Sequence, residues 1–160
     1  MPYGFQQAHM ESVSNVTATN SVELGSIRFH DGEYYEYVYA VGAVNVGYGC
    51  AYSGTSGHSV LATGIVSGEH AAGFCKHATI PAGSYGWLLK KGVIDAPNGR
   101  ASTVTVANDL AYLAADGKVC TDVKVVTSAI DHGHVFGKVL SAGASGGTGA
   151  SLSLVLVSVF

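Results

Sequence analysis

The two residues Asp31-Gly32 place the tightest constraint on how this chain can fold. They lie between residues 26–29 and residues 33–41, two stretches in which side chains alternate and aromatic or β-branched residues are frequent. An Asp-Gly pair between two such stretches is typical of a two-residue β-hairpin turn, because both positions of that turn need positive φ angles. The sequence therefore predicts an antiparallel hairpin over residues 26–41.

The second strand of this hairpin carries tyrosine at three alternate positions. Successive side chains of a strand point to opposite faces, so the tyrosines share one face with Val41, and Val38 lies on the other. We assign Val38 and Val41 to the core. A buried sheet face and a protein interface both stay open for Tyr35 and Tyr37, because a tyrosine ring can be buried while its hydroxyl still finds a partner. The interface candidates are Tyr35, Tyr37 and Tyr39, with Tyr3 and Phe5 near the N-terminus.

A second constraint is residues 80–92, which read Ile-Pro-Ala-Gly-Ser-Tyr-Gly-Trp-Leu-Leu-Lys-Lys-Gly. Pro81 and Gly83 suit a tight turn, since proline presets φ and glycine tolerates positive φ. A strand with the single tryptophan follows, and we expect Gly92 to end it. Trp87 offers the largest apolar area of any side chain in the sequence, so we predict that it anchors the core.

The remaining sequence continues the pattern of short strands and turns. Residues 152–160 are apolar on both faces, which favours a central strand, because such a strand at an edge would invite aggregation. Residues 108–115 are ambiguous between a helical turn capped by Asn108 and a strand that returns through Asp116-Gly117; we favour the second. About ten strands result, with turns every eight to twelve residues. We predict a single all-β domain, an antiparallel β-sandwich or small β-barrel, over residues 25–160, and an extended N-terminal arm over residues 1–24.

The composition favours a protein that is covered by other protein. Only 12% of the residues are charged, against roughly 25% in an average soluble domain. Serine, threonine, glycine, alanine and tyrosine must then form much of the surface, and an uncharged surface suits contact with other subunits. We therefore expect an oligomer or an assembly subunit, with a monomer coated by serine and threonine as the alternative.

Charge and hydropathy argue against several other classes. The net charge of −3 does not fit nucleic-acid binding, which needs a basic face. No run of apolar residues reaches the length of a membrane span, and the first residues do not form a signal-peptide pattern. Three cysteines, Cys50, Cys75 and Cys120, are an odd number, so we expect free thiols formed in a reducing cytoplasm.

Motifs that could carry chemistry do not have the context they need. Residues 143–147 fit G-x-S-x-G, but a nucleophile elbow lies between a strand and a helix, whereas here a strand follows a glycine-rich loop. The pairs Cys75/His77 and His132/His134 have spacings that could ligate a metal, but they are far apart in the sequence. No phosphate-binding loop or dinucleotide fingerprint is present. We expect no enzyme, no metal and no cofactor.

Several of these segments resemble one protein family. The stretch with Asp-Gly-Glu-Tyr-Tyr-Glu-Tyr-Val-Tyr-Ala, residues 25–40, is similar to the first hairpin of tailed-bacteriophage capsid decoration (cement) proteins. Residues 80–92 resemble their G-x-x-G-W strand, and residues 109–119 the segment that follows it. Phe-Gly-Lys-Val-Leu at 136–140, with the closing strand at 152–160, resembles their ending.

The resemblance implies a small β domain without enzymatic activity that forms trimers and clamps neighbouring capsomers. Its partners would be the major capsid protein and further copies of itself, with no nucleic acid and no membrane. It would be assembled in the host bacterial cytoplasm and lie on the capsid surface of the virion. Two other classes stay open. The first is a carbohydrate- or receptor-binding β module of a phage fibre or surface protein, in which tyrosines and His58 would form a sugar platform. The second is a β-barrel enzyme, for which a bound metal would make His132 and His134 candidate ligands again.

Overall fold

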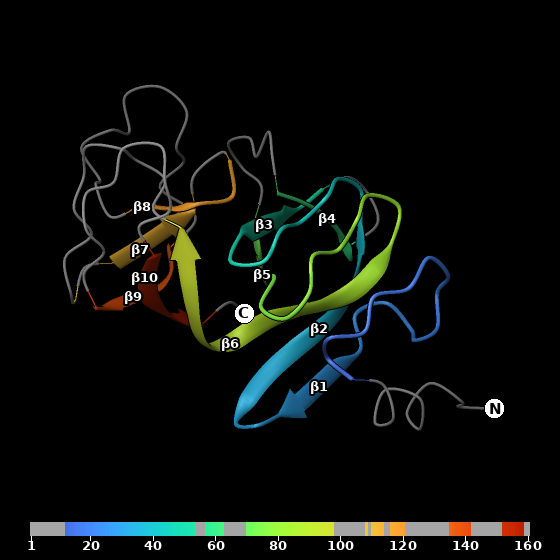
Figure 1. Cartoon of the computed structure of the whole chain (residues 1–160), viewed down its shortest axis with the longest axis horizontal. Helices are drawn as coiled ribbons and strands as arrows, with labels where there is room; N and C mark the ends of the chain where they lie inside the picture. The colour runs from blue at the N-terminus through green and yellow to red at the C-terminus, as the bar shows by residue number, and fades with distance from the viewer. Residues whose placement is uncertain are drawn as a thin grey trace.

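The computed structural model describes residues 12–53, 57–62, 70–97, 108, 110–113, 116–120, 135–141 and 152–158. This part of the chain contains ten strands and no helix (Figure 1), which confirms the predicted all-β class. The strands are β1 (Ile27–His30), β2 (Glu33–Ala40), β3 (Gly49–Tyr52), β4 (Ser59–Leu61), β5 (Ala71–Phe74), β6 (Tyr85–Pro97), β7 (Leu110–Leu113), β8 (Val119–Cys120), β9 (Val135–Ser141) and β10 (Leu152–Ser158).

Five of the strands close into a barrel. They pair in the order β2-β4-β3-β5-β6, and β6 returns to pair with β2. The β2–β4 pair is parallel and the other four pairs are antiparallel. Of the two architectures that the sequence allowed, the structure therefore has the small barrel, with further strands attached to it.

Strand β6 joins the barrel to these further strands. Its first half pairs with β2, and its second half, from Lys91 to Pro97, pairs with β10, which is followed by β9, β7 and β8. Figure 1 shows β6 bending from one group to the other. The expectation that Gly92 ends the strand is wrong: the strand continues through it with a φ of 154°, and a Cβ there would lie against the carboxylate of Glu33. The closing strand β10 lies between β6 and β9, as predicted for a central strand.

The turns follow the sequence closely. Asp31 and Gly32 have φ angles of 50° and 83°, and His30 pairs with Glu33, so the predicted two-residue hairpin is confirmed. The Ser84 N–H donates to the Pro81 carbonyl across the turn that precedes β6. The predicted hairpin around Asp116-Gly117 is also confirmed, because β7 and β8 pair antiparallel on either side of it.

Two hydrophobic cores lie on opposite sides of the barrel wall. The barrel interior is filled by small aliphatic and sulfur-containing side chains with few large ones: Val38, Ala40, Val44, Cys50, Val60, Ala62, Ala72, Cys75, Ile80 and Leu88. The outer core lies between the barrel wall and the segments that cover it: Val13, Val22, Tyr35, Tyr37, Ala51, Phe74, Trp87, Leu89, Ile94, Ala96, Ala111, Leu113, Val119 and Val139. Trp87 is 3% exposed within this outer core.

Residues 12–24, the described part of the predicted arm, lie along the barrel. Val13 and Val22 are buried in the outer core. Thr17 forms an antiparallel bridge with Tyr85, in which each backbone N–H donates to the other residue's carbonyl at 3.0 and 2.8 Å. This segment therefore covers one side of the barrel wall. The boundary between arm and domain at residue 24 stays a prediction.

Candidate functional site

Two tyrosines proposed for an interface lie inside the protein. Tyr35 and Tyr37 are fully buried, so in this fold they have no surface to offer a partner. The Tyr37 hydroxyl lies 3.1 and 3.0 Å from the hydroxyls of Thr17 and Ser21. The Tyr37 hydroxyl thus contacts the chain's own N-terminal segment, and the burial of both side chains does not fit the interface expectation for them.

The other candidate residues have different surroundings. Tyr39 is half-buried, with its ring centroid 5.1 Å from that of Tyr85. Val38 is buried in the barrel, whereas Val41, expected in the core, is half-exposed because it follows the last residue of β2. Tyr3, Phe5, residues 143–147 and the pair His132/His134 lie outside the described residues.

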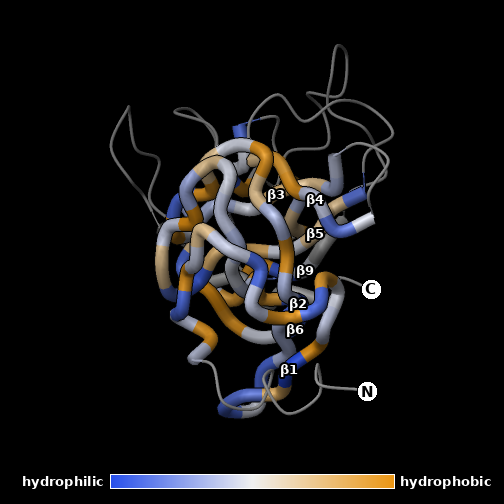
Figure 2. Tube along the Cα trace, turned by 90° about the vertical axis from the view of Figure 1, so that its right-hand side faces the viewer, coloured by the Kyte–Doolittle hydropathy of each residue, from blue (hydrophilic) through white to orange (hydrophobic). Residues whose placement is uncertain are grey.

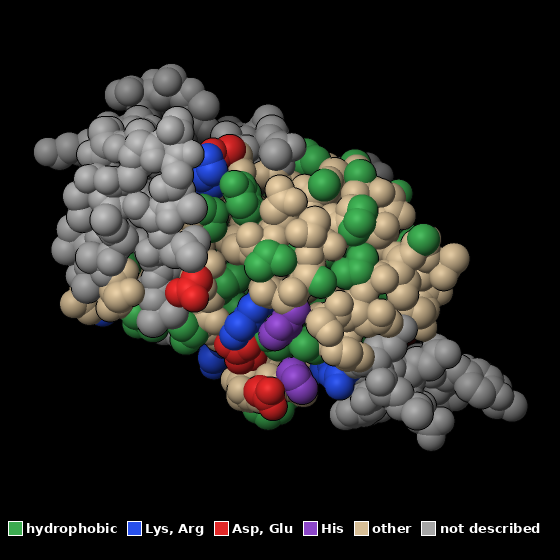
Figure 3. Space-filling view, in the orientation of Figure 1, with side chains coloured by type: hydrophobic (Ala, Val, Ile, Leu, Met, Phe, Trp, Pro, Cys, Tyr) green, Lys and Arg blue, Asp and Glu red, His purple; other side chains and the backbone are tan. Residues whose placement is uncertain are grey.

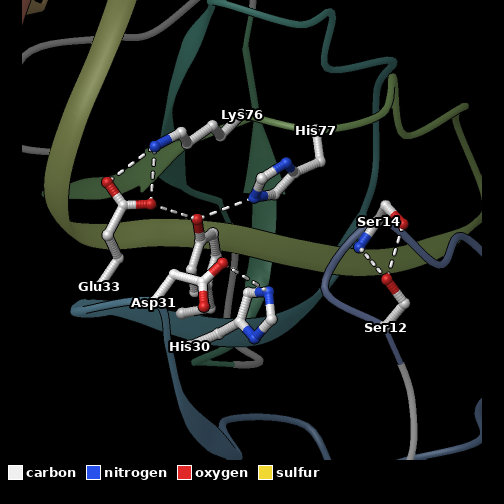
Figure 4. Close-up of polar contacts among 8 residues, drawn as sticks. Ser12, Ser14, His30, Asp31, Glu33, Lys76 and His77 are labelled. Carbon is white, nitrogen blue, oxygen red and sulfur yellow. Dashed lines mark hydrogen bonds and ion pairs between the residues drawn. The ribbon is translucent and has the colours of Figure 1, made fainter.

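The most connected polar group is the carboxylate of Glu33, at the start of β2 (Figure 4). Lys76 donates to both of its oxygens at 2.7 Å, and the Tyr35 hydroxyl donates to Oε2 at 2.6 Å. The Val93 backbone N–H donates to Oε1 at 2.9 Å, just after Gly92. Because the Tyr35 proton points to Glu33, the His77 Nε2–H donates to the Tyr35 oxygen at 2.8 Å.

This arrangement joins three segments of the chain. A carboxylate offers about four acceptor positions, and four donor contacts occupy them here, so none is left to take a proton from a substrate. Burial alone would raise the pKa of Glu33, but the hydrogen bonds from Lys76, Tyr35 and Val93 outweigh it and hold that pKa below its ordinary value. Glu33 is therefore a charged cross-link between β2, β6 and the segment after β5.

A second carboxylate, Glu36, lies at one end of the barrel interior. The Tyr52 hydroxyl donates to Oε2 at 2.6 Å, Lys90 Nζ lies 3.1 Å from the same oxygen, and His58 Nδ1 lies 2.8 Å from Oε1. Lys90 also donates to the Tyr52 oxygen at 2.9 Å. Burial would raise the pKa of Glu36, but the bonds from Tyr52, His58 and Lys90 lower it overall. The charge of Glu36 is therefore paired with Lys90 and hydrogen-bonded within the protein, as that of Glu33 is with Lys76.

Two of the three cysteines, Cys50 and Cys75, behave as core residues. Cys50 and Cys75 are free and buried, and the Cys75 thiol donates to the Ala78 carbonyl at 2.9 Å. Burial raises the pKa of Cys75 to about 11, so the reactive thiolate is scarce near neutral pH. Its sequence neighbour His77 is exposed and bonds Tyr35 instead. The described residues contain no group of three or more potential metal ligands.

Among the described residues, three of the seven exposed large apolar side chains lie together on the β1–β2 hairpin. Ile27, Phe29 and Tyr34 are 57%, 61% and 42% exposed, and the Phe29 and Tyr34 rings lie 5.1 Å apart. We call these three residues the hairpin patch. The hairpin projects beyond the barrel (Figure 2), so the face that is interior along the rest of β2 is open to solvent here. Histidines and charged side chains gather near it, while most of the remaining described surface in that view is uncharged (Figure 3).

The outer edge of β1 also has free backbone groups. Within the described part of the chain, β1 pairs with β2 and with no other strand. The Tyr37 N–H donates to the Ser26 carbonyl at 2.9 Å, and bonded positions alternate along an antiparallel strand. Ser26, Arg28 and His30 therefore face β2, and the N–H and C=O groups of Ile27 and Phe29 point to the open edge.

Sequence reasoning missed the hairpin patch. Residues 26–29 alternate, but this alternation does not show which face of the strand is exposed. The length of β2 was the signal that could have found the patch. β2 has eight residues, whereas the barrel strands β3, β4 and β5 have three or four, so the turn end of the β1–β2 hairpin extends past them.

The fold and this surface define an all-β protein, a small closed barrel with an exposed apolar hairpin. No family model and no curated protein matches the chain. A solved structure, the head fiber gp8.5 N base in bacteriophage phi29, is similar over 78% of this chain and 92% of that chain, with 15% sequence identity and a TM-score of 0.49. A likeness of this degree has no bearing on function. In the part of the chain that the structure describes, no helix is long and apolar enough to cross a membrane.

Proposed function

We propose that this chain is a structural virion protein, a decoration or cement protein that binds the outside of a phage head as an oligomer. The observation that carries the proposal is the hairpin patch, with its adjacent free sheet edge, on a chain with only 12% charged residues. Exposed aromatic and aliphatic side chains that gather in one place mark sites of protein contact. The same hairpin, residues 25–40, is one of the segments that resemble decoration proteins.

The proposed mechanism is thermodynamic linkage. A protein that binds the expanded shell and not its precursor or its dissociated subunits stabilises that shell, by about 2.7 kcal/mol per site when its free concentration is 100 times Kd. No bond is made or broken in this role. The carboxylates of Glu33 and Glu36 support a non-enzymatic role, because both bond to other residues of the fold.

The oligomer in this proposal is a trimer, with the major capsid protein as the second partner. Light scattering after gel filtration should give three times the chain mass of 16.3 kDa. Co-sedimentation with empty expanded phage heads should deplete the protein from solution, and unexpanded heads are the matched control. A monomer that still binds expanded heads would remove the trimer and keep the decoration role. Failure to bind expanded heads, together with selective glycan binding on an array, would replace the proposal with a carbohydrate-binding module.

A further inference from the structure

We propose that the outer edge of β1 is extended by a strand of the partner shell protein, in which apolar residues alternate with acidic ones. The identity of the partner rests on the proposed function; the edge itself rests on the geometry. Edge strands are ordinarily protected by being very short, by charged side chains, by proline, by a bulge or by a covering segment. β1 is short and carries the charged Arg28, but it contains no proline, its four-residue register with β2 is unbroken, and no described segment covers its edge.

The hairpin patch is the reason why the partner strand should carry apolar residues. Ile27 and Phe29 direct their free backbone groups outward in the strand plane, and their side chains stand on the face that they share with Tyr34. A strand added alongside would take up the backbone groups, and its own apolar side chains would pack beside Ile27 and Phe29. Backbone hydrogen bonds would thus set the register, and the patch would supply the buried apolar area.

Arg28 is the reason why the partner strand should also carry an acidic residue. Arg28 lies between Ile27 and Phe29, and its side chain is on the opposite face of β1. It is half-buried, and its Nη1 is enclosed without a hydrogen-bond partner among the described residues. A carboxylate on the added strand, directly across from Arg28, would lie on the same face as this positive charge. The partner segment therefore reads apolar–acidic–apolar.

A second copy of β1 does not meet this requirement. Symmetric antiparallel pairing of Ile27 with Phe29 sets Arg28 opposite Arg28 of the second copy, and like charges directly opposite are destabilising. If the second copy is shifted by two residues, Ile27 or Phe29 must pair with Gly25 or Asp31. These two residues have φ angles of 82° and 50° and do not continue the strand, so one hydrogen-bonded pair is lost. The occupant is accordingly a different strand.

Two substitutions at one position separate the backbone from the side chain. Ile27→Pro removes an outward N–H that the β1–β2 ladder does not use, and proline is tolerated at such an edge position. Ile27→Ala shortens the side chain and keeps the N–H. We expect Ile27→Pro to bind expanded heads at least about tenfold more weakly than Ile27→Ala, with equal thermal unfolding midpoints. Arg28→Glu should also weaken binding about tenfold. If the proline variant does not fold, weaker binding of Arg28→Glu supports the edge inference and unchanged binding overturns it.

A peptide titration keeps this inference separate from the proposed function. The probes are two synthetic ten-residue peptides, one alternating valine with glutamate and the other valine with lysine. With isolated wild-type protein, we expect saturable NMR shifts of the Ile27 and Phe29 amides for the glutamate peptide alone. If heads are bound but Ile27→Pro and Ile27→Ala bind equally, the edge inference is overturned and the decoration role stands. If heads are not bound, the peptide decides: selective shifts keep the edge inference, and unshifted amides overturn it as well.

Discussion

The two cores of this protein differ in the side chains that they hold, although they share the strands β2 and β6. The barrel interior contains valine, alanine, cysteine, isoleucine and leucine, whereas the outer core contains the buried tyrosines, Phe74 and Trp87. A five-stranded barrel encloses little space, so its interior is filled by small side chains. The large aromatic side chains point outward, and the chain must then cover them with other segments of itself.

The cover is assembled from distant parts of the sequence. Val13 and Val22 come from the N-terminal segment, and Leu113, Val119 and Val139 come from β7, β8 and β9. A Cβ on Gly49 would collide with Leu113 and Phe74, which shows how closely the second group approaches the barrel wall. The outer core therefore depends on long-range docking of several segments, while the barrel interior depends mainly on barrel closure, with Val16 of the N-terminal segment packed against it.

Substitutions of two adjacent residues in β6 test this difference and should have the largest effects. Trp87→Ala should lower the free energy of unfolding by about 3–5 kcal/mol, because Trp87 is buried in the outer core, and Leu88→Ala by about 2–5 kcal/mol in the barrel interior. Urea unfolding followed by circular dichroism measures both. A Trp87→Ala protein that unfolds at the same urea concentration as the parent would show that the cover contributes no stability.

Removing the charge of Glu33 tests how much the cross-link between β2, β6 and the segment after β5 contributes to the free energy of unfolding. Glu33→Gln retains the shape but weakens the bonds from Lys76, Tyr35 and Val93, so we expect a loss of about 1–3 kcal/mol. Asp31→Asn is the control, because Asp31 is a nearby carboxylate that is largely exposed. Equal urea midpoints for the two variants would contradict the assigned role of Glu33.

Acid should weaken the barrel through Glu36. The pKa of Glu36 is lower in the folded protein than its ordinary value of 4.5. The stabilisation is therefore fully present above about pH 4.5 and is lost as the pH falls through the folded-state value. Comparison of urea midpoints at pH 7 and pH 3 should show a smaller drop for Glu36→Gln than for the wild type. Equal drops would mean that Glu36 does not contribute to the acid sensitivity.

Local features of this fold were predictable from the sequence, and apart from the central position of β10 the long-range ones were not. Asp31-Gly32 and Asp116-Gly117 specify their hairpins through backbone preferences of adjacent residues. The burial of Tyr35 and Tyr37 depends on the cover, and alternation along a strand cannot show which face a distant segment will occupy. Gly92 looked like a strand end because glycine weakens strands, but here it makes room for the carboxylate of Glu33.

The smallest predicted effect tests the contact between the N-terminal segment and the tyrosines. Tyr37→Phe keeps the buried ring and removes a hydroxyl that lies within hydrogen-bonding distance of Thr17 and Ser21, so we expect a loss of about 0.5–1.5 kcal/mol. The loss should be local, with faster hydrogen exchange at the backbone amides of Thr17 and Tyr85, which bond each other. Tyr39→Phe is the matched control on the same face of β2. If both variants exchange alike, the Tyr37 hydroxyl does not hold the segment, which then depends on the Thr17–Tyr85 backbone bonds and on the buried Val13 and Val22.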